Sequence, residues 1–422
     1  MKHKFLLSFI FIAFCINGFS QNLAFAITGQ SAGNLNWTDI RSIDMASGDV
    51  KSVLFENGKT KYVFEDAETK REIYEISLPS SIKNIPRVSG QEINLNNPSP
   101  TFLMSAAIAY DKKHGKLFFA SMHTGRLVWL DMRADQGVPL FYTIETPLIK
   151  NGNVNDEGLN ITRMTIGANG NGYALTNDAN HLITFTTGQK ITINDLGNLV
   201  DAESNKGISI HNPCSSWGGD VVADAFGKLY LFTANHLVFE IDVDSRIATY
   251  KGFVQNLPAA FSINGAAVDK DENIIVSSAN TFDGFYKLAM KDLNAVKLPT
   301  QGKIFNASDL ASSYLLNENE AKMQSGQLPE IDVIGNKFIS IYPNPVSDGQ
   351  IKISFDHYVA GEYKISLSDL QGRLIENKTV YIKYPGQLEN LKLKTKPVRG
   401  LYLIKVTDAV NQKIFSDKIV IE

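Results

Sequence analysis

A unit of short apolar runs separated by turn residues recurs four times between residues 107 and 288, and this repeat constrains the fold more than any other feature. In each copy a first run ends at Asp or Asn, a turn containing Gly or Asn follows, and a second, almost continuously apolar run comes next. Asp, Asn and Gly accept the backbone angles of tight hairpins. The first runs end at Asp111, Asn169, Asp224 and Asp269. We therefore expect an all-β body of repeated antiparallel sheets.

The spacing of these copies predicts a β-propeller, in which one blade of three or four strands takes about 40–50 residues. Residues 305–316 resemble a first strand with no partners after it, whereas residues 23–28 and 40–45 resemble inner strands that lack a first one. Joining them in one sheet would close the ring and remove exposed edges. Residues 58–100 are either a sixth blade or an insertion. We favour six blades, with five or seven open and a twisted array of β-sandwiches as the alternative.

The first 20 residues have the layout of a secretory signal peptide. Lys2 and Lys4 precede an apolar run, and small residues stand at Gly18 and Ser20 before Gln21. Because a membrane span needs about 20 apolar residues, this run is too short for an anchor. We expect cleavage after residue 20, a folded body over residues 21–316, and no transmembrane anchor. Cleavage leaves Cys214 as the single cysteine, so the mature chain has no internal disulfide.

Charge limits the class of partner. The chain has 41 basic and 44 acidic side chains, and the acidic excess lies in the body while the C-terminal segment is basic. Nucleic-acid binding requires clustered Lys and Arg, so we exclude nucleic acid as a partner of the body.

The sequence predicts a separate domain in the C-terminal part of the chain. Residues 317–337 are polar and irregular, as in a linker. Residues 338–422 contain six or seven short alternating runs, which predict a small immunoglobulin-like β-sandwich.

Residues 338–422 closely resemble the type A C-terminal sorting domain of the type IX secretion system. The matching positions follow one another through the whole segment: Tyr342, Pro343, Asn344 and Pro345, then Gly372 in a turn, Gly400 and Tyr402 at a strand entry, and Lys418 in the last strand. The resemblance implies passage through the periplasm, recognition by the outer-membrane translocon, and cleavage by the sorting peptidase. It also implies a secreted or cell-surface product and no catalytic role for the domain itself.

Three histidines near the second hairpin of successive units are the first candidate site: His123, His181 and His236. If these hairpins share one face of the ring, the imidazoles converge on a metal or ligand. The alternative is that they are exposed neighbours of turn residues, and this alternative is the stronger one. No motif predicts a cofactor, and calcium is left open without a motif to support it.

The loops between units supply a second candidate site, with Arg163, Trp217 and Asp220 near the starts of first strands. In propellers these loops lie on the same face as the second hairpins, over the central channel. Trp217 either stacks on a sugar ring or packs between blades.

Two functions follow. We favour an exported module that binds a glycan, a protein or a small ligand. The alternative is a secreted hydrolase, lactonase or lyase with its site in the channel, so the sequence leaves enzymatic activity undecided.

Overall fold

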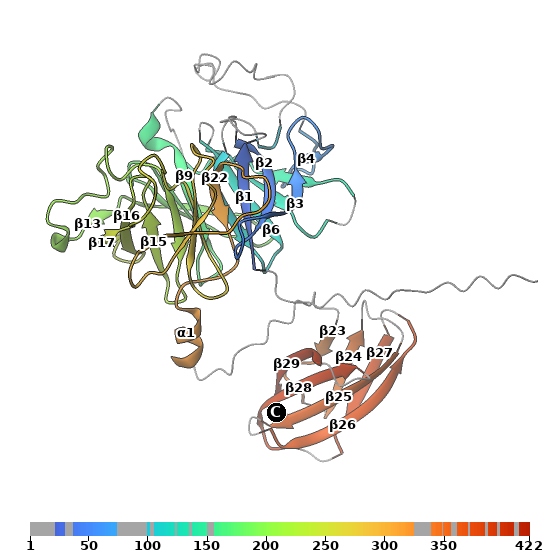
Figure 1. The fold of residues 1–422 in the computed structure, drawn as a ribbon. Coiled ribbons are helices and arrows are strands. Elements are labelled where there is room, and N and C mark those ends of the chain that lie inside the picture. Colours follow the sequence, from blue (N-terminus) through green and yellow to red (C-terminus); the bar gives the residue numbers. More distant parts are fainter. Residues whose placement is uncertain are drawn as a thin grey trace, which may run out of the picture. The chain divides into compact units, whose positions relative to one another are not determined.

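The computed structural model describes residues 22–29, 37–73, 99–101, 105–122, 125–134, 137–149, 156–324, 339–347, 349–355, 361–369, 372–384, 387–394, 397–408 and 413–422. The predicted signal peptide, His123 and much of the predicted linker lie outside these residues. The chain divides into two compact units, Met1–Pro329 and Glu330–Glu422, which we describe separately (Figure 1).

The described residues of the first unit form five sheets. The first sheet has the order β22-β1-β2-β3, with strands Ala307–Ala311, Leu23–Gly29, Trp37–Asp44 and Val50–Phe55. The second has the order β5-β6-β7-β8-β4, with strands Ser105–Asp111, Lys116–Ser121, Leu127–Asp131, Leu140–Thr143 and Val63–Asp66. The third has the order β9-β10-β11-β12, with strands Ile161–Ile166, Gly172–Thr176, Leu182–Phe185 and Ile193–Gly197.

The remaining two sheets follow the same plan. The fourth has the order β14-β15-β16-β17-β13, with strands Asp220–Ala223, Lys228–Phe232, Leu237–Asp242, Ile247–Phe253 and Val200–Asp201. The fifth has the order β18-β19-β20-β21, with strands Gly265–Val268, Ile274–Ser277, Tyr286–Leu288 and Val296–Lys297. Neighbouring strands are antiparallel, except that β4 and β13 pair in parallel at outer edges.

The first strands of the five sheets form a closed ring. Strand β22 packs on β5, β5 on β9, β9 on β14, β14 on β18, and β18 again on β22. Each interface between neighbouring sheets has its own apolar core, such as the cluster of Phe118, Trp129 and Phe185 between the second and third sheets. Apolar residues on both faces of each first and second strand explain these cores, because each sheet is covered on two sides. Such a ring is typical of a β-propeller.

The two ends of the body share one sheet, as the sequence predicts. Phe25 lies opposite Ala311 and Ile27 opposite Asp309, so the last strand of the body completes the sheet of its first strands. The described residues of the body form five sheets, within the range of five to seven blades that the sequence leaves open, and six blades stay a prediction. The described part of residues 58–100 adds β4 to the second sheet, and β22 contacts β5 directly.

The second unit consists of two sheets around one apolar core. The strands of the first are ordered β23-β24-β27 and span Ile339–Tyr342, Gln350–Phe355 and Gln387–Lys392. Those of the second are ordered β26-β25-β28-β29 and span Leu374–Ile382, Gly361–Asp369, Gly400–Asp408 and Lys413–Ile421. Inward residues alternate with exposed ones along β25 and β28, as expected for sheets with one covered face.

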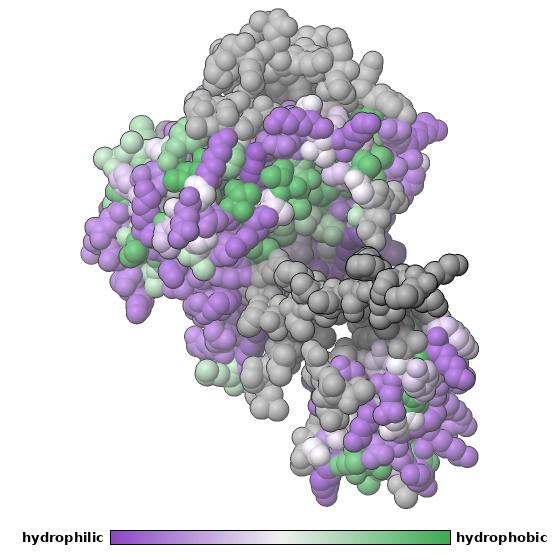
Figure 2. All heavy atoms as spheres, turned by 45° about the vertical axis from the view of Figure 1, so that its right-hand side comes forward, coloured by the Kyte–Doolittle hydropathy of each residue, from purple (hydrophilic) through white to green (hydrophobic). Residues whose placement is uncertain are grey.

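A short helix, α1 (Glu318–Gln324), follows the body where the sequence predicts an irregular linker. It carries no buried residue, and its Glu318–Lys322 ion pair spans one turn. Among the described residues, no helix has the length and apolar character needed to span a membrane. Figure 2 shows hydrophilic side chains over most of the visible surface of both units, with smaller apolar groups between them.

Candidate functional site

The ring encloses a central cavity of about 250 Å³, lined by all five first strands. Its lining uses the second halves of β5 and β9, from Ile108 and Met164 onward, together with Val221, Ala266 and Leu310. It also includes the turns β5–β6 and β9–β10. The cavity therefore opens on the face of the first hairpins, opposite the face on which the sequence places the ligand site.

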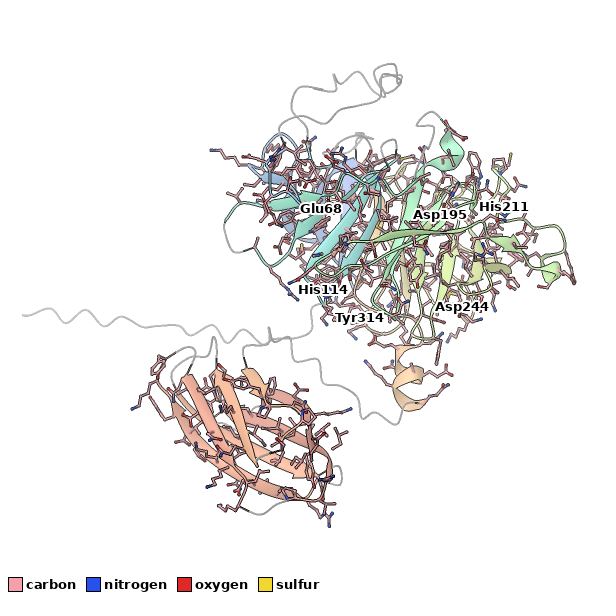
Figure 3. The ribbon with its side chains drawn as sticks, turned by 180° about the vertical axis from the view of Figure 1, so that it is seen from behind. Glu68, His114, Asp195, His211, Asp244 and Tyr314 are labelled. Atoms are coloured by element: carbon pink, nitrogen blue, oxygen red, sulfur yellow. The ribbon has the colours of Figure 1, made fainter. Side chains whose placement is uncertain are left out.

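Polar and aromatic side chains surround the mouth of the cavity. Tyr110, Lys112 and Lys113 lie on one side, and Ser313 and Tyr314 on the other. Figure 3 shows His114 and Tyr314 close to this end of the body, from which α1 extends. Burial raises the pKa of Tyr110, so its phenol stays a neutral hydrogen-bonding group.

Residues 312–316, here called the mouth segment, run past the cavity toward the fourth sheet. The Ser312 hydroxyl donates to the carbonyl of Val268 at 2.7 Å. The Leu316 amide donates to the Ala223 carbonyl at 3.0 Å, and the Leu316 carbonyl accepts from the Ala225 amide at 2.9 Å. These bonds fix the segment beside the cavity before the chain enters α1.

Two carboxyl groups lie next in sequence to the lining residues Val221 and Leu310, on first strands that are not neighbours in the ring. Asp220 on β14 and Asp309 on β22 are completely buried and hydrogen-bonded to each other through their side chains. We call them the axial carboxyl pair. Burial raises the pKa of both groups, and the negative charge of Asp220 raises that of Asp309 further.

Arg163 on β9 is also completely buried, and it binds backbone carbonyls instead of facing the solvent. Its guanidinium donates to the carbonyl oxygens of Thr176 at 2.8 Å, Ser216 at 2.6 Å and Gly218 at 2.8 Å. Burial lowers the pKa of Arg163 to about 9, against the opposing charges of Asp220 and Asp178. Arg163 therefore holds the loop before β14 against the third sheet.

The other predicted site residues of the body that the structure describes, His181, His236 and Trp217, have separate partners or none. His181 Nδ1 lies 2.6 Å from Asp195 Oδ2 on its own sheet, and His236 Nε2 donates to the carbonyl of Phe261 at 2.5 Å. Trp217 is half-buried, and its indole N–H has no hydrogen-bond partner within the described ranges. Among the residues that the structure describes, no three His, Cys, Asp or Glu side chains lie together so that they could hold a metal.

In the second unit, the motif Tyr342–Pro345 is hydrogen-bonded to the last strand, β29. Asn344 donates from Nδ2 to the carbonyl of Lys418 at 3.1 Å and accepts from the Val420 amide at 2.9 Å. Pro343 and Pro345 flank it in the turn after β23. The contact with Lys418 is made to its main-chain carbonyl, while the residue itself is exposed.

The remaining motif positions shape the strands around them. Gly372, at φ +81°, closes the β25–β26 hairpin, where its amide donates to Asp369. Gly400 begins β28, and the Tyr402 hydroxyl donates to the carbonyl of Val398 at 2.6 Å.

Asp309 was not among the predicted site residues, although the sequence around it indicates a buried acid. An aspartate stands within the apolar run Ala307–Ala311, which was expected to be a first strand, and Asp220 opens another first strand. A charged residue in each of two buried strands indicates that the two are paired.

Residues 340–422 match a family model described as the secretion system C-terminal sorting domain. This segment belongs to that family. The sorting domain marks the chain as a secreted or cell-surface protein that interacts with the type IX secretion machinery. No curated protein matches the chain.

Solved structures with similar folds include PorZ, an essential surface component of the type IX secretion system of Porphyromonas gingivalis. PorZ is 13% identical with a TM-score of 0.31, over 94% of this chain and 51% of that chain, so the chain spans about half the length of PorZ. Virginiamycin B lyase from Staphylococcus aureus is 12% identical with a TM-score of 0.29, over 75% of this chain and 84% of that chain. A putative 6-phosphogluconolactonase from Bacteroides uniformis is 9% identical with a TM-score of 0.33, over 68% of this chain and 97% of that chain.

Proposed function

We propose that the body is a five-bladed β-propeller that binds a small, largely apolar ligand in the central cavity after export. The sorting domain, as an immunoglobulin-like sandwich, delivers it and takes no part in binding. The observation that carries this proposal is the cavity itself, which all five first strands line.

The lining supports the class of ligand. Side chains such as Ile108, Met164 and Leu310 offer apolar contact at depth, while Tyr110 and Tyr314 at the mouth offer hydroxyl groups. Sites for drug-sized ligands have volumes of about 300–1,000 Å³. A volume of about 250 Å³ therefore suits a smaller molecule with an apolar end and a polar end.

The lining also favours binding over catalysis. Its acidic member within the described ranges is Asp111, which is already held by His114 at 2.5 Å. A hydrolase or lyase needs a base or nucleophile that reaches its substrate. The acids of the axial pair are completely buried and are not part of the lining.

The test is ligand-observed NMR of the mature chain with a library of small aromatic and aliphatic carboxylates, amides and alcohols. Ala168 is exposed and lines the mouth, so Ala168→Trp narrows the entrance without changing a buried core. Ala46 is an exposed alanine outside the lining, and Ala46→Trp is the matched control.

We expect a subset of compounds to bind the wild type and Ala46→Trp, with affinity at least tenfold weaker for Ala168→Trp. Equal binding to all three proteins, or no binding at millimolar concentration, would contradict the proposal. Conversion of a bound compound would favour the enzymatic alternative.

A further inference from the structure

We propose that Asp220 and Asp309 form a proton-binding site on the axis of the ring, and that the proton they share holds the five first strands together. This inference concerns the ring itself and stands whether or not the cavity binds a ligand.

Backbone amides from all five first strands converge on the axial carboxyl pair. Asp309 Oδ2 accepts from the Ile108 amide of β5, and Oδ1 accepts from the Leu310 amide of β22, both at 2.7 Å. Asp220 accepts from the Val221 amide of β14 and the Ala266 amide of β18, each at 2.7 Å. The Met164 amide of β9 also donates to Asp220. Each first strand thus contributes one N–H to the same two side chains.

The contact between the two carboxyl groups requires a proton. An ionised carboxylate offers only acceptors, so two ionised groups cannot hydrogen-bond to each other. Both side chains are completely buried, where water does not screen their repulsion. One proton converts the repulsion into a hydrogen bond and leaves the remaining oxygens to accept the five amides.

The charges around the pair do not replace this proton. Strand β9 supplies one cation, Arg163, whose N–H groups are directed at carbonyl oxygens. Beyond Arg163 lies Asp178, whose charge acts on that guanidinium. The ionisable residues of β5 are Tyr110 and Asp111 at its far end. Strands β14, β18 and β22 carry no ionisable side chain other than the pair itself. One positive charge therefore faces two carboxyl groups.

The direction of the pH effect follows from the raised pKa of the pair. An unfolded aspartate has a pKa near 3.9, so above about pH 5 the unfolded chain leaves these groups ionised while the folded ring keeps one proton. Folding then takes up a proton, and stability falls as pH rises. Between about pH 5 and the pH at which the pair releases its proton, each pH unit multiplies the unfolding equilibrium constant by up to about ten.

The experiment is urea unfolding of the mature chain across this pH range, followed by tryptophan fluorescence. Trp37, Trp129 and Trp217 are all in the body, so the signal reports the ring and not the sorting domain. In Asp309→Asn an amide replaces the shared proton with a permanent N–H donor. Asp269→Asn is the matched control, because Asp269 is a buried acceptor of the Asp271 and Asn273 amides without a carboxyl partner.

We expect the wild type and Asp269→Asn to lose stability with the same pH slope, and Asp309→Asn to lose most of that slope while being less stable at pH 5. A wild type whose stability is constant or increases over this range, or an unchanged slope in Asp309→Asn, would overturn the proposal.

A second readout does not depend on the variant folding. The infrared spectrum of the wild type at neutral pH should contain the C=O stretching band of a protonated carboxylic acid, and this band should disappear as the ring loosens in alkali. Its absence at neutral pH would overturn the proposal equally.

Discussion

At the scale of single residues, Arg163 and Asp220 show how far sequence reasoning reaches. Both were predicted near the channel, and both lie at first-strand positions of the ring. Position along a strand follows from the repeat. Their surroundings depend on chain segments far away, since Asp220 meets Asp309 and Arg163 meets Ser216 and Gly218. Both residues lie on first strands, and their role in binding a ligand stays a prediction.

Replacing Arg163 tests its role in holding the loop before β14. In Arg163→Met three carbonyl oxygens lose their buried donor, and each such loss costs about 1–3 kcal/mol. We expect the free energy of unfolding of the body to fall by roughly 3 kcal/mol or more, measured by urea unfolding with tryptophan fluorescence. Arg133 is exposed and makes its hydrogen bond at the surface, so Arg133→Met should change it by less than about 0.5 kcal/mol. A loss below about 1 kcal/mol for Arg163→Met would contradict this role.

At the scale of elements, the hairpins of the body were predictable because turn residues and apolar runs are local signals. The strand units that begin at Ala107, Thr165, Val221 and Ala266 correspond to the inner strands of four sheets. The pairing of β4 with β8 was not predictable, because parallel strands at an outer edge are joined by a long connection without a local signal. The preference for six blades arose from this element.

The contact between β18 and β22 leads to a prediction about Gly265. A Cβ atom on Gly265 would lie 2.7 Å from the backbone nitrogen of Leu310 and 2.6 Å from the Ser277 hydroxyl. Gly265→Ala forces these strands apart, and such overpacking costs about 1–3 kcal/mol. Gly188→Ala is the control, because a Cβ there meets nothing within 4 Å. Equal unfolding midpoints in urea for the two variants would show that the strands are less closely packed than described.

At the scale of the whole molecule, the chain combines a body of its own with a sorting domain recognisable from sequence. The sorting domain was predictable because its motif residues fix a turn and a strand within about 85 residues. The central cavity was not, because its lining comes from five strands that are far apart in the sequence.

Removing residues 340–422 separates delivery from folding. We expect the shortened chain to accumulate in the periplasm, because the secretion machinery no longer recognises it, while tryptophan fluorescence of the purified body stays native. Cell fractionation with an antibody against the body measures this. The full-length Arg133→Met variant is the control for normal export. Appearance of the shortened chain at the cell surface would show that the body carries its own export signal.

The first sheet, in which β22 pairs with β1, can be completed only late in synthesis. Strand β1 is made first, but its partner β22 is the last strand of the body, so β1 keeps an open edge until almost the whole body has been made. Open strand edges invite pairing with other chains, and contacts so distant in sequence form slowly. The sorting domain is made after this last strand of the body. A chain interrupted before residue 307 therefore lacks both the strand that completes the ring and the sorting domain, so an incomplete ring is never joined to the signal for secretion.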